Sequence, residues 1–117
     1  MKLYDTSVWV DFFAGAQRAA PAKAALNSRE AAVSVITLAE IKLKQNKAGK
    51  PSKPLIDFIR NWSTVLELDE ETALLAGEFT GLHATDAMIY ATAQKNGMEL
   101  VTCDNDFRGM KGVKLLE

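Results

Sequence analysis

The sequence contains almost none of the residues that build a disulfide scaffold, a metal-thiolate centre or a membrane span. Its 117 residues include one cysteine, Cys103, and one histidine, His83. A single cysteine cannot form an internal disulfide, and a thiolate metal site needs several Cys or His ligands. No apolar run approaches the ~20 residues that cross a bilayer. We therefore expect a cytoplasmic protein that does not enter a membrane.

An excess of charge of one sign is also missing. The chain has 14 basic and 15 acidic side chains, which give a formal net charge of -1. No overall positive field attracts nucleic acid, so any such binding has to come from a local patch. The first residues, MKLYDTSVWV, contain an Asp where a signal peptide would be apolar, and we expect no targeting segment.

What the chain does have is the composition and periodicity of one α/β domain. Apolar residues make up 48% and charged residues 25% of the chain, as in ordinary globular proteins. Short apolar stretches predict strands at residues 2–4, 32–35, 65–68, 100–101 and 113–116. Helical spacing predicts helices at 8–13, 18–28, 37–47, 55–62, 70–80 and 84–94. This alternation predicts a single domain over residues 1–117, an α/β three-layer sandwich with a central, mainly parallel sheet and helices on both faces.

Five acidic residues occupy positions where such a fold binds ligands. Asp5 and Asp104 follow predicted strands, and ligands of open parallel sheets lie beyond the carboxyl ends of the strands. Asp106 comes two residues later, Glu40 lies in the helical segment TLAEI, and Asp86 is in the first turn of the helix ATDAMIYATAQ. That helix has small or apolar side chains on nearly every side, so an ionised carboxylate within it needs compensation.

Each acid taken alone also has an ordinary structural explanation. These explanations are a helix N-cap, an exposed helix face, a helix-dipole partner and a turn residue, for Asp5, Glu40, Asp86 and Asp104 respectively. Acids that meet at one sheet edge, however, raise one another's pKa and destabilise the fold unless a cation bridges them. Oxygen ligands without His or Cys favour Mg²⁺ or Mn²⁺ over zinc. We therefore predict a divalent-metal site, of the kind that holds phosphate groups and activates water.

Three segments carry a resemblance to a known family. DTSVWVDFF, TLAEI and TDAMIYATAQKNGMELVTCDNDF resemble, in order and spacing, the PIN-domain ribonucleases, and in size the VapC-type toxins of prokaryotic toxin-antitoxin pairs. The resemblance implies an endoribonuclease that depends on Mg²⁺ or Mn²⁺. It implies four catalytic acids that also bind the metal, namely Asp5, Glu40, Asp86 and Asp104. Asp106 is implied as a fifth or substitute metal ligand. Three hydroxyl residues would support the acids through hydrogen bonds, namely Thr6, Ser7 and Thr102. Family members often have Arg where this chain has Cys103, so a phosphate contact at that position is either lost or supplied elsewhere.

The resemblance also implies partners. They are an RNA substrate, a second copy of the chain in a homodimer, and a cognate antitoxin whose C-terminal segment lies across the active-site groove. Lysines follow Glu40 with no intervening acid, and Lys44 and Lys47 fall near the Glu40 face of their helix. These two lysines, together with Arg108 after DNDF, are candidate contacts to RNA phosphates. The alternative for all three is an ordinary solvated surface.

Two other functions are compatible with the same residues. One is a PIN-like fold that cleaves nothing and binds RNA or protein, against which the complete set of acids argues. The other is a small Mg²⁺-dependent phosphohydrolase acting on nucleotides. The second is weakened because no glycine-rich phosphate loop or D-x-D motif follows the first predicted strand.

Overall fold

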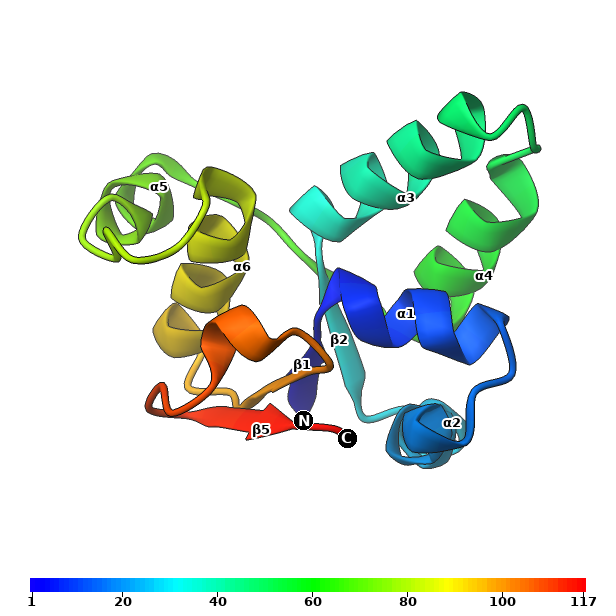
Figure 1. The fold of residues 1–117 in the computed structure, drawn as a ribbon, viewed down its shortest axis with the longest axis horizontal. Coiled ribbons are helices and arrows are strands. Elements are labelled where there is room, and N and C mark those ends of the chain that lie inside the picture. The colour runs from blue at the N-terminus through cyan, green and yellow to red at the C-terminus, as the bar shows by residue number, and fades with distance from the viewer.

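The centre of the molecule is one parallel sheet of five short strands, seen in a computed structural model that describes residues 1–117 (Figure 1). The strands are β1 (Lys2–Tyr4), β2 (Ala31–Ser34), β3 (Thr64–Leu66), β4 (Leu100–Thr102) and β5 (Val113–Leu115). Their order is β3-β2-β1-β4-β5, and every adjacent pair is parallel. Because β1 lies in the middle of the sheet, Leu3 pairs with Ala32 on one side and with Leu100 on the other. All five predicted strands are present, and the prediction of a parallel α/β sheet is confirmed.

Six helices and two single 3-10 turns cover this sheet. The helices are α1 (Thr6–Phe13), α2 (Ala20–Asn27), α3 (Val35–Lys47), α4 (Lys53–Trp62), α5 (Glu70–Ala76) and α6 (Ala84–Lys95). The 3-10 turns are η1 (Gln17–Ala19) and η2 (Asn105–Phe107). Helices α5 and α6 gather on one side of the sheet, and α1, α2 and α4 on the other (Figure 1). None of the helices is both long enough and apolar enough to cross a membrane.

Two boundaries differ from the expected ones for identifiable reasons. The predicted loop 48–54 is shorter than expected, because Pro54 lies in the first turn of α4, where a missing N–H costs nothing. The helix predicted over 70–80 ends at Ala76, and the backbone N–H of Gly77 caps it by donating to carbonyls of the last turn. The chain then turns back so that α6 can begin at Ala84 and pack against α5.

The two faces of the sheet bury separate clusters of side chains, because successive residues of a strand point to opposite faces. Tyr4 and Val101 face the side of α1, α2 and α4, where they join the fully buried Trp9 and Ile59 in one core. Leu3 and Leu100 face the other side and pack with residues of α6 and η2, namely Ile89, Tyr90, Ala93 and Phe107. Helix α6 is buried on the side of the sheet and on the side of α5, which explains its all-round apolar sequence.

The carboxyl ends of the strands meet at one edge of this sandwich. Asp5 follows β1, and its backbone N–H extends the pairing with β4 by donating to the carbonyl of Val101 at 2.9 Å. Ser34, the last residue of β2, caps α3 by accepting from the N–H of Ile36. Thr102 is the last residue of β4. The chain therefore delivers three polar residues from three neighbouring strands to one place.

Candidate active site

Asp5 is a buried carboxylate at the centre of this edge. Only 3% of the residue is exposed, and Oδ2 accepts hydrogen bonds from the hydroxyls of Thr102 at 2.7 Å and Ser7 at 3.0 Å. Although Asp5 stands at the N-cap position of α1, its side chain makes no capping hydrogen bond. Burial raises its pKa above the usual value, the hydroxyls oppose that rise, and the charge of Glu40 adds to it. The carboxylate is thus held by one hydroxyl from α1 and one from β4, and it does not cap the helix.

The three hydroxyl residues of the predicted site form a network around the acids. Thr102 Oγ1 donates to Asp5 and accepts from the backbone N–H of Asp104 at 3.0 Å. Ser7 Oγ donates to Asp5 and accepts from the backbone N–H of Cys103 at 3.0 Å. These contacts tie the start of α1 to the segment after β4. They fix the direction of Asp5 and the path of the backbone at Asp104.

Glu40 reaches the same place from α3. Its Oε1 accepts a hydrogen bond from Thr6 Oγ1 at 2.7 Å, and the Thr6 hydroxyl also lies 2.9 Å from that of Thr37. Glu40 is partly buried. Thr6 holds one of its carboxylate oxygens, and the other oxygen has no hydrogen-bond partner in the chain. Glu40 is therefore positioned by Thr6 of α1, the residue that directly follows Asp5.

Asp86, Asp104 and Asp106 bring three more carboxylates together. One oxygen from each lies within 4.8 Å of the others. Asp104 caps η2, because its Oδ1 accepts from the backbone N–H of Asp106 at 2.9 Å. Asp86 projects from the first turn of α6. A helix and a 3-10 turn that are distant in sequence thus present acids to each other.

The pKa of Asp86 shows that all five acids share one electrostatic environment. It is raised to about 6, first by burial and then by the negative charges of the other four acids, which are Asp5, Asp104, Glu40 and Asp106. The six ion pairs of the chain lie elsewhere, and none involves any of these five residues. The five acids therefore form a negative site that no cation of the chain compensates.

The donor set suits a small divalent cation. It consists of carboxylate oxygens, with no imidazole or thiolate among the three grouped acids, and this chemistry favours Mg²⁺ or Mn²⁺. Oxygens that share one Mg²⁺ are at most ~4.2 Å apart, because each lies at about 2.1 Å from the ion. The three grouped carboxylates, all within 4.8 Å, stand close to that spacing. The residues present therefore fit the predicted ion.

The basic residues near the predicted site differ in their exposure and in their hydrogen-bond partners. Lys44 and Lys47 are exposed on the last turns of α3, beyond Glu40. Arg108 donates from Nε and Nη2 to Asn105 and pairs through Nη2 with Glu117, which leaves only Nη1 without a partner in the chain. His83 stands exposed at the N-cap position of α6 and makes no capping hydrogen bond.

Two residues beside the site were missed by the sequence reasoning. Asp11 lies one helical turn after Ser7 on the same face of α1, and it pairs with the guanidinium of Arg18. It also raises the pKa of the nearby thiol of Cys103. The spacing of Ser7 and Asp11 could have indicated Asp11, but no local pattern indicates Arg18. Burial and the neighbouring Asp11 raise the pKa of Cys103 to about 11, so its thiol stays protonated and serves as a packing group.

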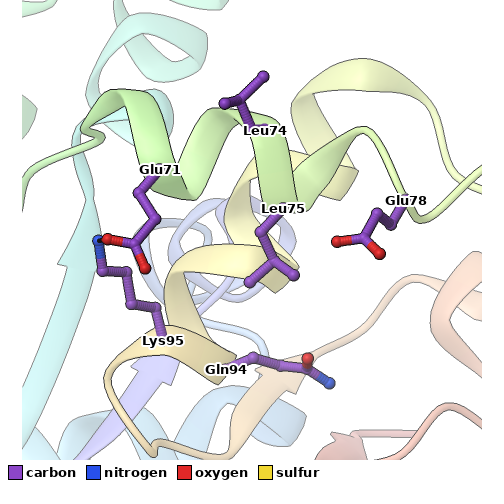
Figure 2. Close-up of a pocket in the computed structure, with 6 residues that line it drawn as sticks. All are labelled: Glu71, Leu74, Leu75, Glu78, Gln94 and Lys95. Atoms are coloured by element: carbon purple, nitrogen blue, oxygen red, sulfur yellow. Dashed lines mark hydrogen bonds and ion pairs between the residues drawn. The ribbon is translucent and has the colours of Figure 1, made fainter.

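One hollow of the surface, of about 490 Å³, lies away from the acids. Figure 2 shows the residues that line it, on and beside α5 and α6: Glu71, Leu74, Leu75, Glu78, Gln94 and Lys95. The side chains around it are those of two packed helices, and Lys95 is bound to Asp69 and Glu71. Lys95 therefore neutralises acids beside this hollow, whereas no cation of the chain pairs with the five acids at the sheet edge. The candidate active site is therefore the acidic edge of the sheet.

Comparisons with known proteins give one consistent result. A family model described as PIN domain matches residues 2–113. A toxin-antitoxin complex from Klebsiella pneumoniae contains a chain of 28% identity, with a TM-score of 0.77 over 97% of this chain and 96% of that one. VapBC2 from Rickettsia felis, solved with a DNA fragment of its promoter, is similar at 15% identity and a TM-score of 0.80 over 99% and 98% of the two chains.

A third solved structure shares the whole length of the chain. It is a sarcin-ricin loop cleaving toxin from Mycobacterium tuberculosis, with 22% identity and a TM-score of 0.75 over 100% of both chains. At these last two identities the likeness concerns the fold alone. No curated protein matches the sequence significantly.

Proposed function

Because the chain belongs to the PIN domain family, we propose that it is a metal-dependent endoribonuclease, the VapC-type toxin of a toxin-antitoxin pair. The observation that supports this most strongly is the convergence of Asp5, Glu40, Asp86, Asp104 and Asp106 on one electrostatic site with no cation of the chain paired to them. A fold does not by itself define an activity, so we infer the activity from the residues of this site. The toxin-antitoxin complex among the similar structures, at 28% identity, supports the same assignment.

In this proposal each acid has a role that its contacts support. Asp86, Asp104 and Asp106 hold the ion, and Asp5 and Glu40 complete its surroundings with carboxylates held in place by Ser7, Thr102 and Thr6. Mg²⁺ or Mn²⁺ at such a site supplies a Lewis acid for the phosphate and lowers the pKa of water, which prepares a nucleophile for the phosphodiester bond. Fixed hydroxyls matter because misplacement of a reacting group by even about 1 Å slows a reaction strongly.

The chain's own carboxylates can also handle protons. An acid with a pKa near 6, such as Asp86, can accept and release a proton near neutral pH when no ion is bound. Once a cation neutralises the cluster, its acids are ionised and serve to orient water and phosphate. Lys44 and Lys47 on α3 and Arg108 after η2 are the proposed contacts to the RNA backbone.

The proposal includes two protein partners. One is a cognate antitoxin, as in the similar complexes, and the other is a second copy of the chain. Large apolar side chains that stay exposed, Leu43, Trp62 and Leu74, are available for such contacts. The proposed location is the cytoplasm, where the RNA substrate is.

The test compares cleavage of a panel of labelled RNAs by the purified chain and by Asp86→Asn, each in Mn²⁺, in Mg²⁺ and in EDTA. Asp57→Asn is the matched control, because Asp57 is an aspartate on α4 paired only with Lys53. We expect fragments from the wild type and the control in either metal, none in EDTA, and none from Asp86→Asn. Cleavage by Asp86→Asn at the wild-type rate would refute the site. RNA binding without cleavage, unchanged by EDTA, would instead identify a non-catalytic binding module.

A further inference from the structure

A second polar cluster adjoins the acidic site along α1. Ser7 and Asp11 lie one turn apart on the same face of this helix, and Ser7 accepts from the backbone N–H of Cys103. The side chain of Asp11 lies close enough to the Cys103 thiol for each group to shift the pKa of the other. Arg18, from η1, closes the cluster with an ion pair to Asp11. Since Cys103 directly precedes Asp104, this cluster is one residue away from the acids.

The way Asp11 holds Arg18 leaves most of the guanidinium unused. The contact is made by Nε alone, which donates to Asp11 Oδ2, and the two Nη atoms have no hydrogen-bond partner in the chain. A guanidinium has five N–H donors, so four of them remain available. The Arg18 side chain is 43% exposed, so these donors are accessible to a ligand from solvent. Arg108 contrasts with this, because Nε and Nη2 already bind Asn105 and Glu117.

The charge distribution gives Arg18 a reason to be there. An RNA strand that reaches the five acids carries a negative charge at each phosphate. The acids repel those phosphates that do not lie next to a bound metal ion. Two cations act on the charge of Asp11, namely Arg18 and Lys44. Lys44 lies one turn beyond Glu40 on α3. The acidic edge is thus bordered at Asp11 by a cation from η1 and a cation from α3.

We propose that Arg18 binds the RNA phosphate next to the one being cleaved, that Asp11 is its positioning residue, and that Lys44 contacts the strand on the other side of Asp11. The proposal rests on the ribonuclease function proposed above and adds residues to it. Two parallel N–H donors on one edge of a guanidinium match two oxygens of a phosphate. Fixing Nε on Asp11 presents the Nη edge in a defined direction, which a free arginine side chain would have to pay for in entropy.

The first experiment measures RNA binding without cleavage. A single-stranded RNA oligonucleotide is titrated onto Asp86→Asn in EDTA over a series of salt concentrations, with and without Arg18→Gln. We expect Arg18→Gln to weaken binding about tenfold, because a hydrogen-bonded charge is lost. The slope of log affinity against log salt should fall by about 0.7, which corresponds to one phosphate contact fewer. Arg60→Gln, an exposed arginine near the end of α4, is the control and should change neither quantity.

Two further variants separate a phosphate contact from a structural role. Arg18→Lys keeps the charge and loses the fork, so it should restore the salt slope but only part of the affinity. Asp11→Asn keeps the charge of Arg18 and loses the anchor of Nε, so it should reduce kcat of RNA cleavage more than it weakens binding. All three variants should bind Mn²⁺ as the wild type does, because none of these side chains belongs to the acid set.

The outcomes distinguish this inference from the function on which it rests. An unchanged affinity and salt slope in Arg18→Gln, in a chain that cleaves RNA and loses cleavage in Asp86→Asn, would overturn the role of Arg18 and leave the ribonuclease intact. Loss of Mn²⁺ binding in Arg18→Gln would also overturn it, since the arginine would then act through the fold of the acidic site. A wild-type chain that neither binds nor cleaves RNA would overturn both proposals.

Discussion

Replacing Asp86 with Asn should stabilise the metal-free protein while abolishing its activity. The carboxyl of Asp86 has a pKa raised from 3.8 to about 6 by burial and by four like charges. At 1.36 kcal/mol per unit this shift corresponds to about 3 kcal/mol against the ionised form, and solvent screening at this partly exposed position reduces it to about 1–2 kcal/mol. The amide has nearly the same shape as the carboxyl and carries no charge. Above pH 6, in EDTA, Asp86→Asn should therefore unfold at a higher urea concentration than the wild type.

The pH dependence follows from the direction of the shift. Because the folded-state pKa lies above the unfolded-state value, the folded protein binds the proton more tightly, and stability from this group is complete only at low pH. The free energy of unfolding of the wild type should fall as pH rises from 3.8 through about 6 and should then stay constant. The difference in stability between Asp86→Asn and the wild type should grow over the same pH range. Urea unfolding of the wild type and of Asp86→Asn in EDTA at pH 4, 5, 6 and 7 measures this difference. Equal stabilities of Asp86→Asn and the wild type at pH 7 would refute the argument from repulsion and burial.

Three other predictions follow from the same structure. Adding Mn²⁺ should raise the unfolding temperature of the wild type and leave Asp86→Asn almost unchanged, and equal shifts in both proteins would place the ion elsewhere. Thr102→Val should cost about 1–3 kcal/mol of stability and reduce cleavage strongly, because it removes a hydrogen bond from buried Asp5. Thr102→Ser should retain both stability and cleavage, and urea unfolding and an RNA cleavage assay measure the two variants. Ile89→Ala should cost about 2–5 kcal/mol in urea unfolding, since the side chain is fully buried beneath α6, while Leu74→Ala on the exposed face of α5 should change stability little.

Local sequence signals were enough to predict the order of elements. The consecutive apolar residues Leu3 and Tyr4 reflect a strand that is buried on both faces, and the all-round apolar helix after His83 reflects burial on two sides. Ends were predicted less well. Helix α5 stops at Ala76, directly before Gly77, a local stop signal that the predicted range 70–80 passed over. The chain then turns back into α6, which packs against α5.

The acids of the site could be predicted in identity but not in arrangement. Asp5 has the local pattern of an N-cap, yet its carboxylate makes no capping hydrogen bond and accepts instead from Thr102, 97 residues away in sequence. Asp104 does cap, as its turn pattern suggested, and it also faces Asp86. A local pattern states which hydrogen bonds a side chain can make, and distant partners decide which one it makes.

By itself, the sequence determined the class of fold and the chemical character of the site. Strand periodicity and helix caps act over a few residues, and the absence of cysteine and histidine partners excludes soft-ligand metal sites wherever the chain folds. Only the tertiary structure decided that five acids from separate segments share one electrostatic environment. It alone also placed Arg18 on Asp11 beside them, with its Nη donors unpaired. The physical reason is that charge repulsion, burial and ion pairing depend on distances through space, which the parallel crossovers of this fold set between residues far apart along the chain.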